Sequence, residues 1–434
     1  MIMIGSFPHK ILAKILAYEA RRILRLHKPI VVGITGSFGK SSAKEAIAAV
    51  LSRSGKSVRK TPKNENTELG VPKTIIGSRA GAGLFSWVKI LCRGASLCLN
   101  YRTNIEAYPQ ILVLEMAAEY PGDIDYLVKL APPKIGVLTG IGPAHSEFLG
   151  SPEKILAEKS LLITELPKDG VAVLNADDNL VISLVEKTKA RVITFSVHNQ
   201  ADVHATDFVL MRTGFHAKIS WHGQTVPILI EGVVGLPHLY ACLAGVAVGL
   251  ALGMKFEDAV SGLRDYQSLP GRMRLIPGVK GSTIIDDSYN ANPEAVKRAL
   301  EVLLNFPSDP VAKRYAVLGD MRELGKQSAE YHEEVGRTIA DMKIDFFIGV
   351  GALMREAFAA ARKNGMDESH LFHFATSYEA GEFVKDKTRS GDIILIKGSQ
   401  NQIRMERAVY ALMAEPDRAA ELLVRQGPEW VKKD

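Results

Sequence analysis

One glycine-rich run in the sequence has the residue types and spacing of a phosphate-binding loop. It reads Gly33-Ile34-Thr35-Gly36-Ser37-Phe38-Gly39-Lys40-Ser41-Ser42 and stands between a predicted strand over 30–35 and a predicted helix over 40–53. Glycines let such a turn aim backbone N–H groups at phosphate oxygens, and the helix N-terminus adds partial positive charge. Lys40 would reach the β- and γ-phosphates, and the Ser41 hydroxyl would bind Mg²⁺. The run therefore predicts an ATP-binding loop.

The spacing of this loop differs by one position from the common phosphate-loop pattern. G-x-x-x-x-G-K-S would require glycine at position 34, which is isoleucine, and the spacing here is T-G-x-x-G-K-S. An ordinary glycine-rich turn is the alternative, but lysine followed by serine at a helix start argues against it. We expect the nucleotide to be held by Thr35, Gly36, Ser37, Phe38, Gly39, Lys40, Ser41 and Ser42.

Two further residues have the chemistry of metal ligands. Glu115 ends a predicted strand over 111–116, at the edge where open α/β sheets bind their ligands. Apolar or small residues flank it, so a charge there needs a partner. His145 follows a predicted strand over 134–139 and could bind a second Mg²⁺ through a ring nitrogen. The alternatives are a solvated strand-end acid and a structural histidine.

The rhythm of the chain predicts an α/β protein with two sheets. Strands are expected at 30–35, 111–116, 134–139, 171–175 and 192–196, alternating with helices at 40–53, 123–130 and 152–166. Such βαβ alternation indicates a mostly parallel sheet. Residues 203–231 interrupt this alternation of strands and helices, and two hairpins are predicted there. Beyond a predicted hinge at Pro270-Gly271, strands at 283–286, 315–318, 346–350 and 393–396 alternate with helices at 293–304 and 329–342, which predicts a smaller, Rossmann-like C-terminal domain.

Length and composition set the remaining limits. The chain has 434 residues, which suggests two to three domains, and we assign 1–28 to an N-terminal basic helix, 29–271 to a central ATPase domain with an antiparallel insertion at about 202–231, and 272–434 to a C-terminal domain. Three cysteines exclude a disulfide scaffold and favour the cytoplasm. The net charge of +6 is too small to indicate nucleic-acid binding.

Three segments raise the question of membrane contact, although no signal peptide is recognisable. Residues 11–26 form a predicted basic amphipathic helix, which either packs on the next domain or touches an anionic membrane surface. Residues 84–99 are apolar but interrupted by charges, and suit an interfacial hairpin or a lid. Residues 239–254 are uncharged but too short to span a bilayer, so we expect a buried core helix.

The T-G-x-x-G-K-S spacing resembles that of the Mur ligases, and other signatures of that family follow in order. They are Asn64-Glu65-Asn66-Thr67-Glu68-Leu69-Gly70-Val71-Pro72, Leu114-Glu115-Met116, Gly142-Pro143-Ala144-His145-Ser146-Glu147, Ala157-Glu158-Lys159, Leu174-Asn175-Ala176-Asp177-Asp178, Pro270-Gly271-Arg272-Met273-Arg274, Asp286-Asp287-Ser288-Tyr289-Asn290-Ala291-Asn292-Pro293, Leu318-Gly319-Asp320-Met321-Arg322-Glu323-Leu324-Gly325 and Lys397-Gly398-Ser399. The resemblance covers about residues 29–412.

The resemblance implies an ATP- and Mg²⁺-dependent amide ligase of peptidoglycan precursor synthesis. The segments at 270–274 and 286–293 are most similar to the branch that joins D-alanyl-D-alanine to a UDP-N-acetylmuramoyl-tripeptide through an acyl phosphate. It implies catalytic roles for Lys40, His145 and Arg272. It also implies that Lys159 becomes a carbamate and binds Mg²⁺ together with Ser41, Glu115 and His145. The alternative for Lys159 is a surface lysine paired with Glu158 or Glu165.

The same resemblance assigns the binding of substrates. Substrate contacts are expected from Asn64, Asn66, Thr67, Lys397 and Ser399. Asp286 or Asp287 would hold the ribose hydroxyls, and Tyr289 and Asn290 would flank the base. His332 and Glu323 would lie near the incoming amine, unless they are ordinary helix-surface residues. The partners implied are small molecules, a UDP-muramyl peptide and D-Ala-D-Ala, and we expect a monomer.

The sequence also departs from the family pattern. Only residues 1–32 precede the loop, so we expect the N-terminal domain that grips the uridine nucleotide to be missing. Pro237 and Ala241 replace a histidine and an asparagine, and Gln400 replaces an arginine. Two other functions stay open: a relative that acts on a different carboxylate or carrier, and a non-catalytic ATP-binding partner protein.

Overall fold

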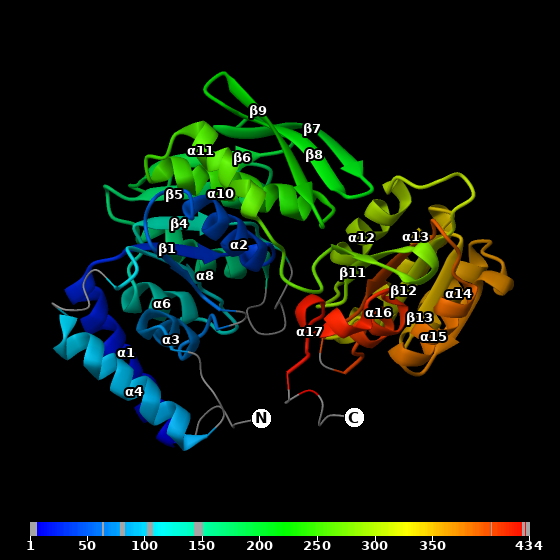
Figure 1. Cartoon of the computed structure of the whole chain (residues 1–434), viewed down its shortest axis with the longest axis horizontal. Coiled ribbons are helices and arrows are strands. Elements are labelled where there is room, and N and C mark those ends of the chain that lie inside the picture. Colours follow the sequence, from blue (N-terminus) through cyan, green and yellow to red (C-terminus); the bar gives the residue numbers. More distant parts are fainter. Residues whose placement is uncertain are drawn as a thin grey trace. The chain divides into compact units, whose positions relative to one another are not determined.

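The chain folds into two compact units, each built around its own sheet (Figure 1). The structure is a computed structural model in which residues 7–62, 65–78, 83–101, 107–142, 151–400, 402–427 and 430 are described. The first unit comprises Met1–Asp207, Ala217–Ile228 and Pro237–Gln267, and the second comprises Phe208–His216, Leu229–Leu236 and Ser268–Asp434.

The first sheet has nine strands in the order β2-β3-β1-β4-β5-β6-β7-β8-β9. Its first seven strands are joined by parallel pairings, which confirms the predicted parallel-dominated α/β fold. The strands are β1 (Ile30–Thr35), β2 (Val58–Lys60), β3 (Ile111–Glu115), β4 (Ile135–Leu138), β5 (Val171–Asn175), β6 (Arg191–Ser196), β7 (Val203–Met211), β8 (Gly214–Trp221) and β9 (Gln224–Glu231).

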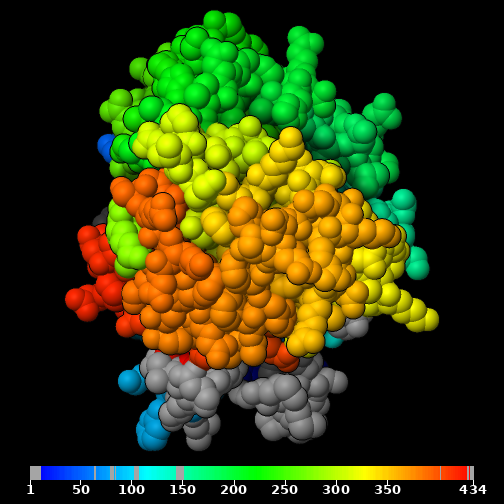
Figure 2. Space-filling view, turned by 90° about the vertical axis from the view of Figure 1, so that its right-hand side faces the viewer, coloured from blue at the N-terminus to red at the C-terminus, as the bar shows by residue number. Residues whose placement is uncertain are grey.

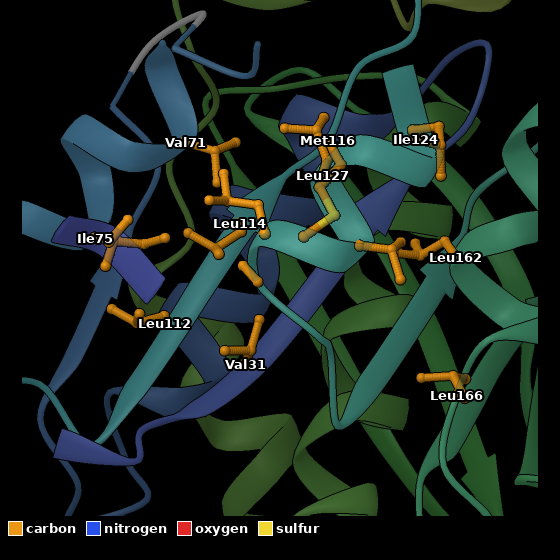
Figure 3. Packing of buried hydrophobic residues seen from close by; sticks show 14 of the residues in the cluster. Val31, Val71, Ile75, Leu112, Leu114, Met116, Ile124, Leu127, Leu162 and Leu166 are labelled. Carbon is orange, nitrogen blue, oxygen red and sulfur yellow. The ribbon is translucent and has the colours of Figure 1, made fainter. Parts of the chain in front are cut away.

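Helices cover this sheet because its strands are apolar on both faces. In Figure 3, Leu112, Leu114 and Met116 of the β3 segment point from one face toward side chains of three neighbouring helices. On the other face, the helix that follows the glycine-rich loop packs closely on the apolar helix that contains Gly245. A Cβ at Gly245 would lie 3.1 Å from the backbone of Ala46 in the former helix. The helices are α1 (Phe7–His27), α2 (Lys40–Leu51), α3 (Gly70–Ile76), α4 (Leu84–Leu99), α6 (Asp123–Leu130), α8 (Pro152–Thr164), α9 (Asn179–Ile182), α10 (Leu236–Ala251) and α11 (Phe256–Ser261).

Three segments that suggested membrane contact are all helical. The inner face of α1 shares one hydrophobic core with α3, α6 and β3. Residues 84–99, for which a hairpin or lid was considered, form the single helix α4 beside α1. The predicted core helix at 239–254 is α10, which begins at Leu236 and has a buried face over most of its length. Among the described residues, no helix combines the length and apolar character needed to cross a bilayer.

The predicted insertion at about 202–231 contains β7, β8 and β9, which extend the first sheet. Strand β7 pairs parallel to β6, and turns at 212–213 and 222–223 connect it to β8 and β9. The compact units also divide within these hairpins and again between 267 and 268, a few residues before the predicted hinge. Within the second unit, Val233, which follows β9, forms an isolated antiparallel bridge with Arg274.

The second sheet has six strands in the order β10-β11-β15-β12-β13-β14, of which only β10 runs antiparallel to its neighbour. Two hydrophobic clusters fill its two faces. Figure 2 shows the outer surface of this unit in yellow and orange. Its strands and helices are β10 (Arg274–Pro277), β11 (Thr283–Asp287), α12 (Pro293–Asn305), β12 (Arg314–Gly319), α13 (Ser328–Asp341), β13 (Phe346–Val350), α14 (Met354–Lys363), β14 (Leu371–Phe374), α15 (Ser377–Lys387), β15 (Ile393–Lys397), α16 (Glu406–Leu412) and α17 (Ala419–Leu422).

One buried carboxylate ties the segment after Pro270 to β11. Asp286 accepts hydrogen bonds from the backbone N–H groups of Gly271 and Ser288 at 3.0 and 3.1 Å. The side chain is fully buried, and burial raises its pKa to about 6. Two backbone donors therefore depend on this single residue.

We expect Asp286→Asn to lower the free energy of unfolding by about 1–3 kcal/mol, because an amide offers one acceptor to two buried N–H groups. The loss should also depend on pH. Between about pH 4 and pH 6 the folded protein keeps the Asp286 proton that the unfolded chain has lost, so this carboxyl makes wild-type stability fall as pH rises. Urea unfolding across that range should show the gap between wild type and variant narrowing with rising pH. A gap that widens would contradict the raised pKa.

Candidate active site

The glycine-rich loop has the backbone of an anion-binding turn. Gly36 and Gly39 have φ angles of 150° and 78°, conformations that other residues rarely adopt. A Cβ at Gly36 would lie 2.1 Å from the Thr139 Oγ1, so the loop packs against the end of β4 only because this residue is glycine. Thr139 in turn donates its hydroxyl to the carbonyls of Thr35 and Phe38. The Ser37 N–H donates to the Gly140 carbonyl at 2.8 Å.

The start of α2 is open to an anion. Its N-cap residue, Gly39, provides no side-chain cap, and no acidic residue stands in the first turn. The first N–H groups of a helix have no acceptor within the helix, so those of Lys40, Ser41 and Ser42 can donate to a ligand. The Lys40 Nζ donates to the Gly36 carbonyl at 2.7 Å, so its charge lies at the same loop. Donors and cation therefore converge where a phosphate chain would lie.

We expect Gly36→Ala to abolish nucleotide binding without unfolding the protein. The added methyl group meets Thr139 and forces the loop away from the geometry that aims its N–H groups. Isothermal titration with ATP and Mg²⁺ measures the effect. Gly55→Ala is the matched control, because Gly55 also has a positive φ of 71° but nothing within 4 Å of the new methyl group. Equal loss in both variants would show that the loop geometry is unimportant.

Glu115 is the centre of a buried polar cluster at the end of β3. Its Oε1 accepts hydrogen bonds from the Ser41 hydroxyl at 3.1 Å and from the Asn66 amide at 3.0 Å. Its Oε2 lies 3.3 Å from the ammonium of Lys44. Only 2% of Glu115 is exposed. The predicted metal ligands Ser41 and Glu115 thus lie together, and the predicted substrate residue Asn66 contacts the same carboxylate.

Lys44 was missed by the sequence reasoning. It has no exposed surface and lies between Glu115 and Glu45, whose Oε1 is 3.6 Å from the Lys44 Nζ. Glu45 also pairs with Lys60. The available signal was helical spacing, because residue 44 follows Ser41 by one turn and therefore shares its face of the helix. We assign Lys44 the role of holding the Glu115 carboxylate charged and oriented.

Lys159 is buried at the inner face of α8, with 1% of its surface exposed. Burial lowers the pKa of its ammonium to about 7, and the charge of Lys40 acts in the same direction. Among the described residues, no carboxylate forms an ion pair with it. Glu158, the proposed partner in the alternative interpretation, instead accepts the N–H groups of Gly122 and Ile124 at the start of α6, at 2.9 and 2.8 Å.

Some of the remaining predicted residues of the first unit are described by the structure, and others are not. Thr35 and Ser42 are buried at the ends of β1 and α2, and Phe38 is exposed. Thr67 is exposed, and its carbonyl accepts the Val71 N–H that starts α3. Asn64 and His145 lie outside the described residues, so their predicted roles stay predictions.

A second polar cluster forms where β11 and β15 end side by side. Asp287 and Lys397 are direct neighbours in this parallel pair and form a partly buried ion pair of 2.5 Å. The Lys397 Nζ also donates to the Asn290 carbonyl at 2.9 Å. Ser399 accepts the Arg322 N–H at 2.8 Å through its hydroxyl. The structure thus brings together the predicted residues Asp287, Asn290, Lys397 and Ser399.

Arg272 and Tyr289 form a stacked pair in the same unit. The Arg272 guanidinium lies 4.2 Å from the centre of the Tyr289 ring. Arg425, which the sequence reasoning did not consider, donates to the Tyr289 carbonyl at 2.6 Å and pairs with Glu406 at 3.1 Å. Because Arg425 is far away in sequence and follows no recognised motif, no sequence signal pointed to it.

A surface pocket of about 360 Å³ lies beside this cluster, lined by the segment 320–325 and by Ala352 and Leu353. His332 supports the pocket wall from behind. Its Nε2 accepts the Met321 N–H at 3.0 Å, and its Nδ1 bonds the Ser328 carbonyl at 2.6 Å. Both ring nitrogens are therefore engaged within the fold, and His332 has a structural role here. Glu323 is exposed at the pocket edge.

The first unit's site is chemically suited to a metal-bound nucleotide. The hydroxyl of Ser41 and the carboxylate of Glu115 are the hard oxygen donors that Mg²⁺ prefers. The charge of Lys40, together with the open helix N-terminus, favours a phosphate chain. A parallel α/β sheet that carries such a loop at the carboxyl ends of its strands defines the class of phosphate-loop nucleotide-binding proteins.

Comparison with known proteins narrows this class. The family model of the Mur ligase middle domain matches residues 96–249, and that of the Mur ligase glutamate ligase domain matches residues 271–400. UDP-N-acetylmuramoyl-tripeptide--D-alanyl-D-alanine ligase of Mycobacterium tuberculosis is 31% identical over 403 residues, covering 89% of this chain and 73% of the relative. The Bacillus subtilis enzyme of that name is 30% identical over 388 residues, covering 89% and 76%.

A solved structure agrees in fold. The MurF ligase of Thermotoga maritima, in complex with ADP, superposes with a TM-score of 0.75 at 29% identity, covering 94% of this chain and 84% of its own. The chain therefore belongs to the Mur ligase family, which confirms the resemblance seen in its motifs.

Proposed function

We propose that this protein is an ATP-dependent amide ligase that joins D-alanyl-D-alanine to a UDP-N-acetylmuramoyl-tripeptide in peptidoglycan precursor synthesis. The relatives of this name support the substrates. The observation that carries the proposal is the buried cluster of Ser41, Glu115 and Lys44 beside an open phosphate loop. ATP supplies the phosphoryl group that turns the acceptor carboxylate into an acyl phosphate, and Mg²⁺ neutralises the charge of the phosphates.

The residues of the first unit orient and activate the reactants. The N–H groups of residues 40–42 and the side chain of Lys40 would hold the phosphates, and Ser41 and Glu115 would hold Mg²⁺ together with His145. Asn64, Asn66 and Thr67 belong to the loop that presents the acceptor, and Asn66 links that loop to Glu115. Lys159 has the burial and lowered pKa that reaction of its neutral amine with CO₂ requires, and the resulting carbamate adds oxygen donors.

The residues of the second unit bind the nucleoside and the amine. Asp287, Tyr289 and Asn290 would contact ribose and base, and Arg272 would contact the transferred phosphoryl group. Lys397 and Ser399 support the pocket wall through Asp287 and Arg322. The pocket at 320–325 has the size for a dipeptide, and its lining includes Arg322 and Glu323, so we assign it to D-alanyl-D-alanine.

The division of labour along the chain is proposed from the sequence. We assign 29–271 to the ATPase domain, 272–434 to the amine-binding domain and 1–28 to a helix that joins the former. We propose a monomer, and the need for ATP together with the free cysteines favours the cytoplasm. The net charge gives no reason to propose nucleic-acid binding.

Phosphate release tests this function. The protein is incubated with ATP, Mg²⁺, UDP-N-acetylmuramoyl-tripeptide and D-alanyl-D-alanine, and then with each component omitted in turn. We expect release only in the complete mixture, with the ligated peptide detected by mass spectrometry. Turnover that requires a different acceptor would assign the protein to another carboxylate or carrier, and ATP binding without turnover would identify a non-catalytic partner protein.

A further inference from the structure

Helices α1 and α4 lie side by side at the edge of the first unit and carry an unusual outer surface (Figure 1). Their inner faces pack into the core through Leu16, Ile23 and Ile90. Their outer faces expose large apolar side chains at helical spacing. These are Ile11, Ile15 and Tyr18 of α1 and Phe85, Val88 and Leu99 of α4, with Phe85 and Leu99 exposed by 86% and 75%. Each outer face is therefore an apolar stripe in contact with solvent.

The charges on this surface are of one sign. Lys14, Arg22 and Arg25 stand on the exposed side of α1, and Lys89 and Arg93 stand on that of α4. The single acidic residue of the two helices, Glu19, is turned inward, where its Oε2 is buried beside Gly94. Among the described residues, no carboxylate neutralises Lys14, Arg22, Arg25 or Lys89 through an ion pair.

We propose that the outer face of α1 and α4 binds the surface of an anionic lipid bilayer, with both helices lying in the plane of the interface. Apolar side chains flanked by lysine and arginine are the combination that inserts shallowly between anionic headgroups. This inference goes beyond the proposed ligase activity and does not depend on it, because none of these residues belongs to the candidate active site.

The lipid surface is favoured over two other occupants by the same observations. A second copy of the chain would bring the basic residues of one face against those of the other, which costs energy. A spanning orientation is excluded for the described helices, because none is long and apolar enough. A free anion would explain the basic residues but would leave the exposed phenylalanine, leucine and valine without a partner.

The full-length protein offers a built-in probe for the test. Cys92 is exposed on α4, whereas Cys98 and Cys242 are buried, so a thiol-reactive, environment-sensitive dye labels Cys92 selectively. The labelled protein is mixed with vesicles of phosphatidylcholine, with or without phosphatidylglycerol, and binding is measured by dye emission and by co-sedimentation of unlabelled protein. We expect binding and a blue shift only with phosphatidylglycerol, and release at high salt.

Two variants should weaken binding by roughly tenfold each, through different forces. Phe85→Ser with Val88→Ser removes apolar contact, and Arg22→Glu with Arg25→Glu reverses charge. Val209→Ser with Leu229→Ser is the matched control, because it removes two exposed apolar side chains from β7 and β9 and should bind like wild type. Circular dichroism checks that each variant folds, and ATP binding should be unchanged in all three.

Three outcomes would overturn the proposal. They are no difference between the two kinds of vesicle, equal loss in the control variant, and a stable dimer in light scattering that the Phe85 variant dissociates. The last result would identify a second copy of the chain as the occupant. Failure of the ligase assay would leave the vesicle result unaffected, so the two proposals fail separately.

Discussion

Replacement of Lys159 by alanine is expected to reduce the ligation rate by roughly 10³-fold, at the upper end of what loss of one charge-stabilising group costs. The buried amine has a pKa lowered to about 7, so at neutral pH a substantial fraction is uncharged and able to react with CO₂. Alanine cannot form the carbamate, and the two oxygen donors are lost. A short carboxylic acid such as acetate, added to the variant, should restore part of the rate by occupying the space of the carbamate. Phosphate release with and without acetate measures both effects.

Lys154→Ala is the matched control for this prediction, because Lys154 is exposed on the same helix and should be dispensable. A second readout is independent of activity. Wild-type protein equilibrated with ¹³C-labelled CO₂ should show a carbamate carbon signal by NMR that Lys159→Ala lacks and Lys154→Ala keeps. Full activity of Lys159→Ala, or an unchanged carbamate signal, would refute the role of Lys159.

The elements that carry the site could be predicted from sequence because their signals are local. The strands β1, β3, β4 and β5 are short and fully buried, so each appears as an unbroken apolar run that turn residues delimit. The loop after β1 combines glycines with Lys40 and Ser41 in consecutive positions. Some short elements were not predicted, because their signals are not local and depend on contacts with other segments. Helix α3 has seven residues, and strand β14 is a half-buried edge strand whose identity depends on pairing with β13.

The contacts inside the site were less predictable, because they join residues that are distant in sequence. Glu158 directly precedes Lys159, which made an ion pair between them plausible from sequence, yet its carboxylate caps α6 instead. In the sequence, Lys44 cannot be distinguished from a lysine on a helix surface. Its partner Glu115 lies 71 residues later in the chain, and only the fold places the two side chains in contact. His332 occurs in a recognisable segment, but only the hydrogen bonds of both ring nitrogens reveal a structural residue.

The buried pair of Lys44 and Glu115 makes it possible to separate stability from catalysis at the proposed metal site. We expect Lys44→Met to lower the free energy of unfolding by about 3–5 kcal/mol, because it leaves the buried Glu115 carboxylate without the cation that lies 3.3 Å away. Glu115→Gln should cost less, about 1–3 kcal/mol, since Lys44 retains Glu45 at 3.6 Å. Urea unfolding measures both values. Activity should be lost in Glu115→Gln, because its amide is a far poorer ligand for Mg²⁺ than a carboxylate.

The double variant Lys44→Met with Glu115→Gln distinguishes the two roles. Because neither charge is then buried alone, its stability should exceed that of Lys44→Met, although both substitutions are present. Its ligase activity should nevertheless stay absent, since the carboxylate proposed to bind Mg²⁺ is missing. Lys56→Met, an exposed lysine just beyond α2, controls for the loss of one positive charge and should change neither property. If the two losses of stability simply add, the ion pair does not couple these residues, and Lys44 must act on the site through another contact, for which Glu45 and its partner Lys60 are the first candidates.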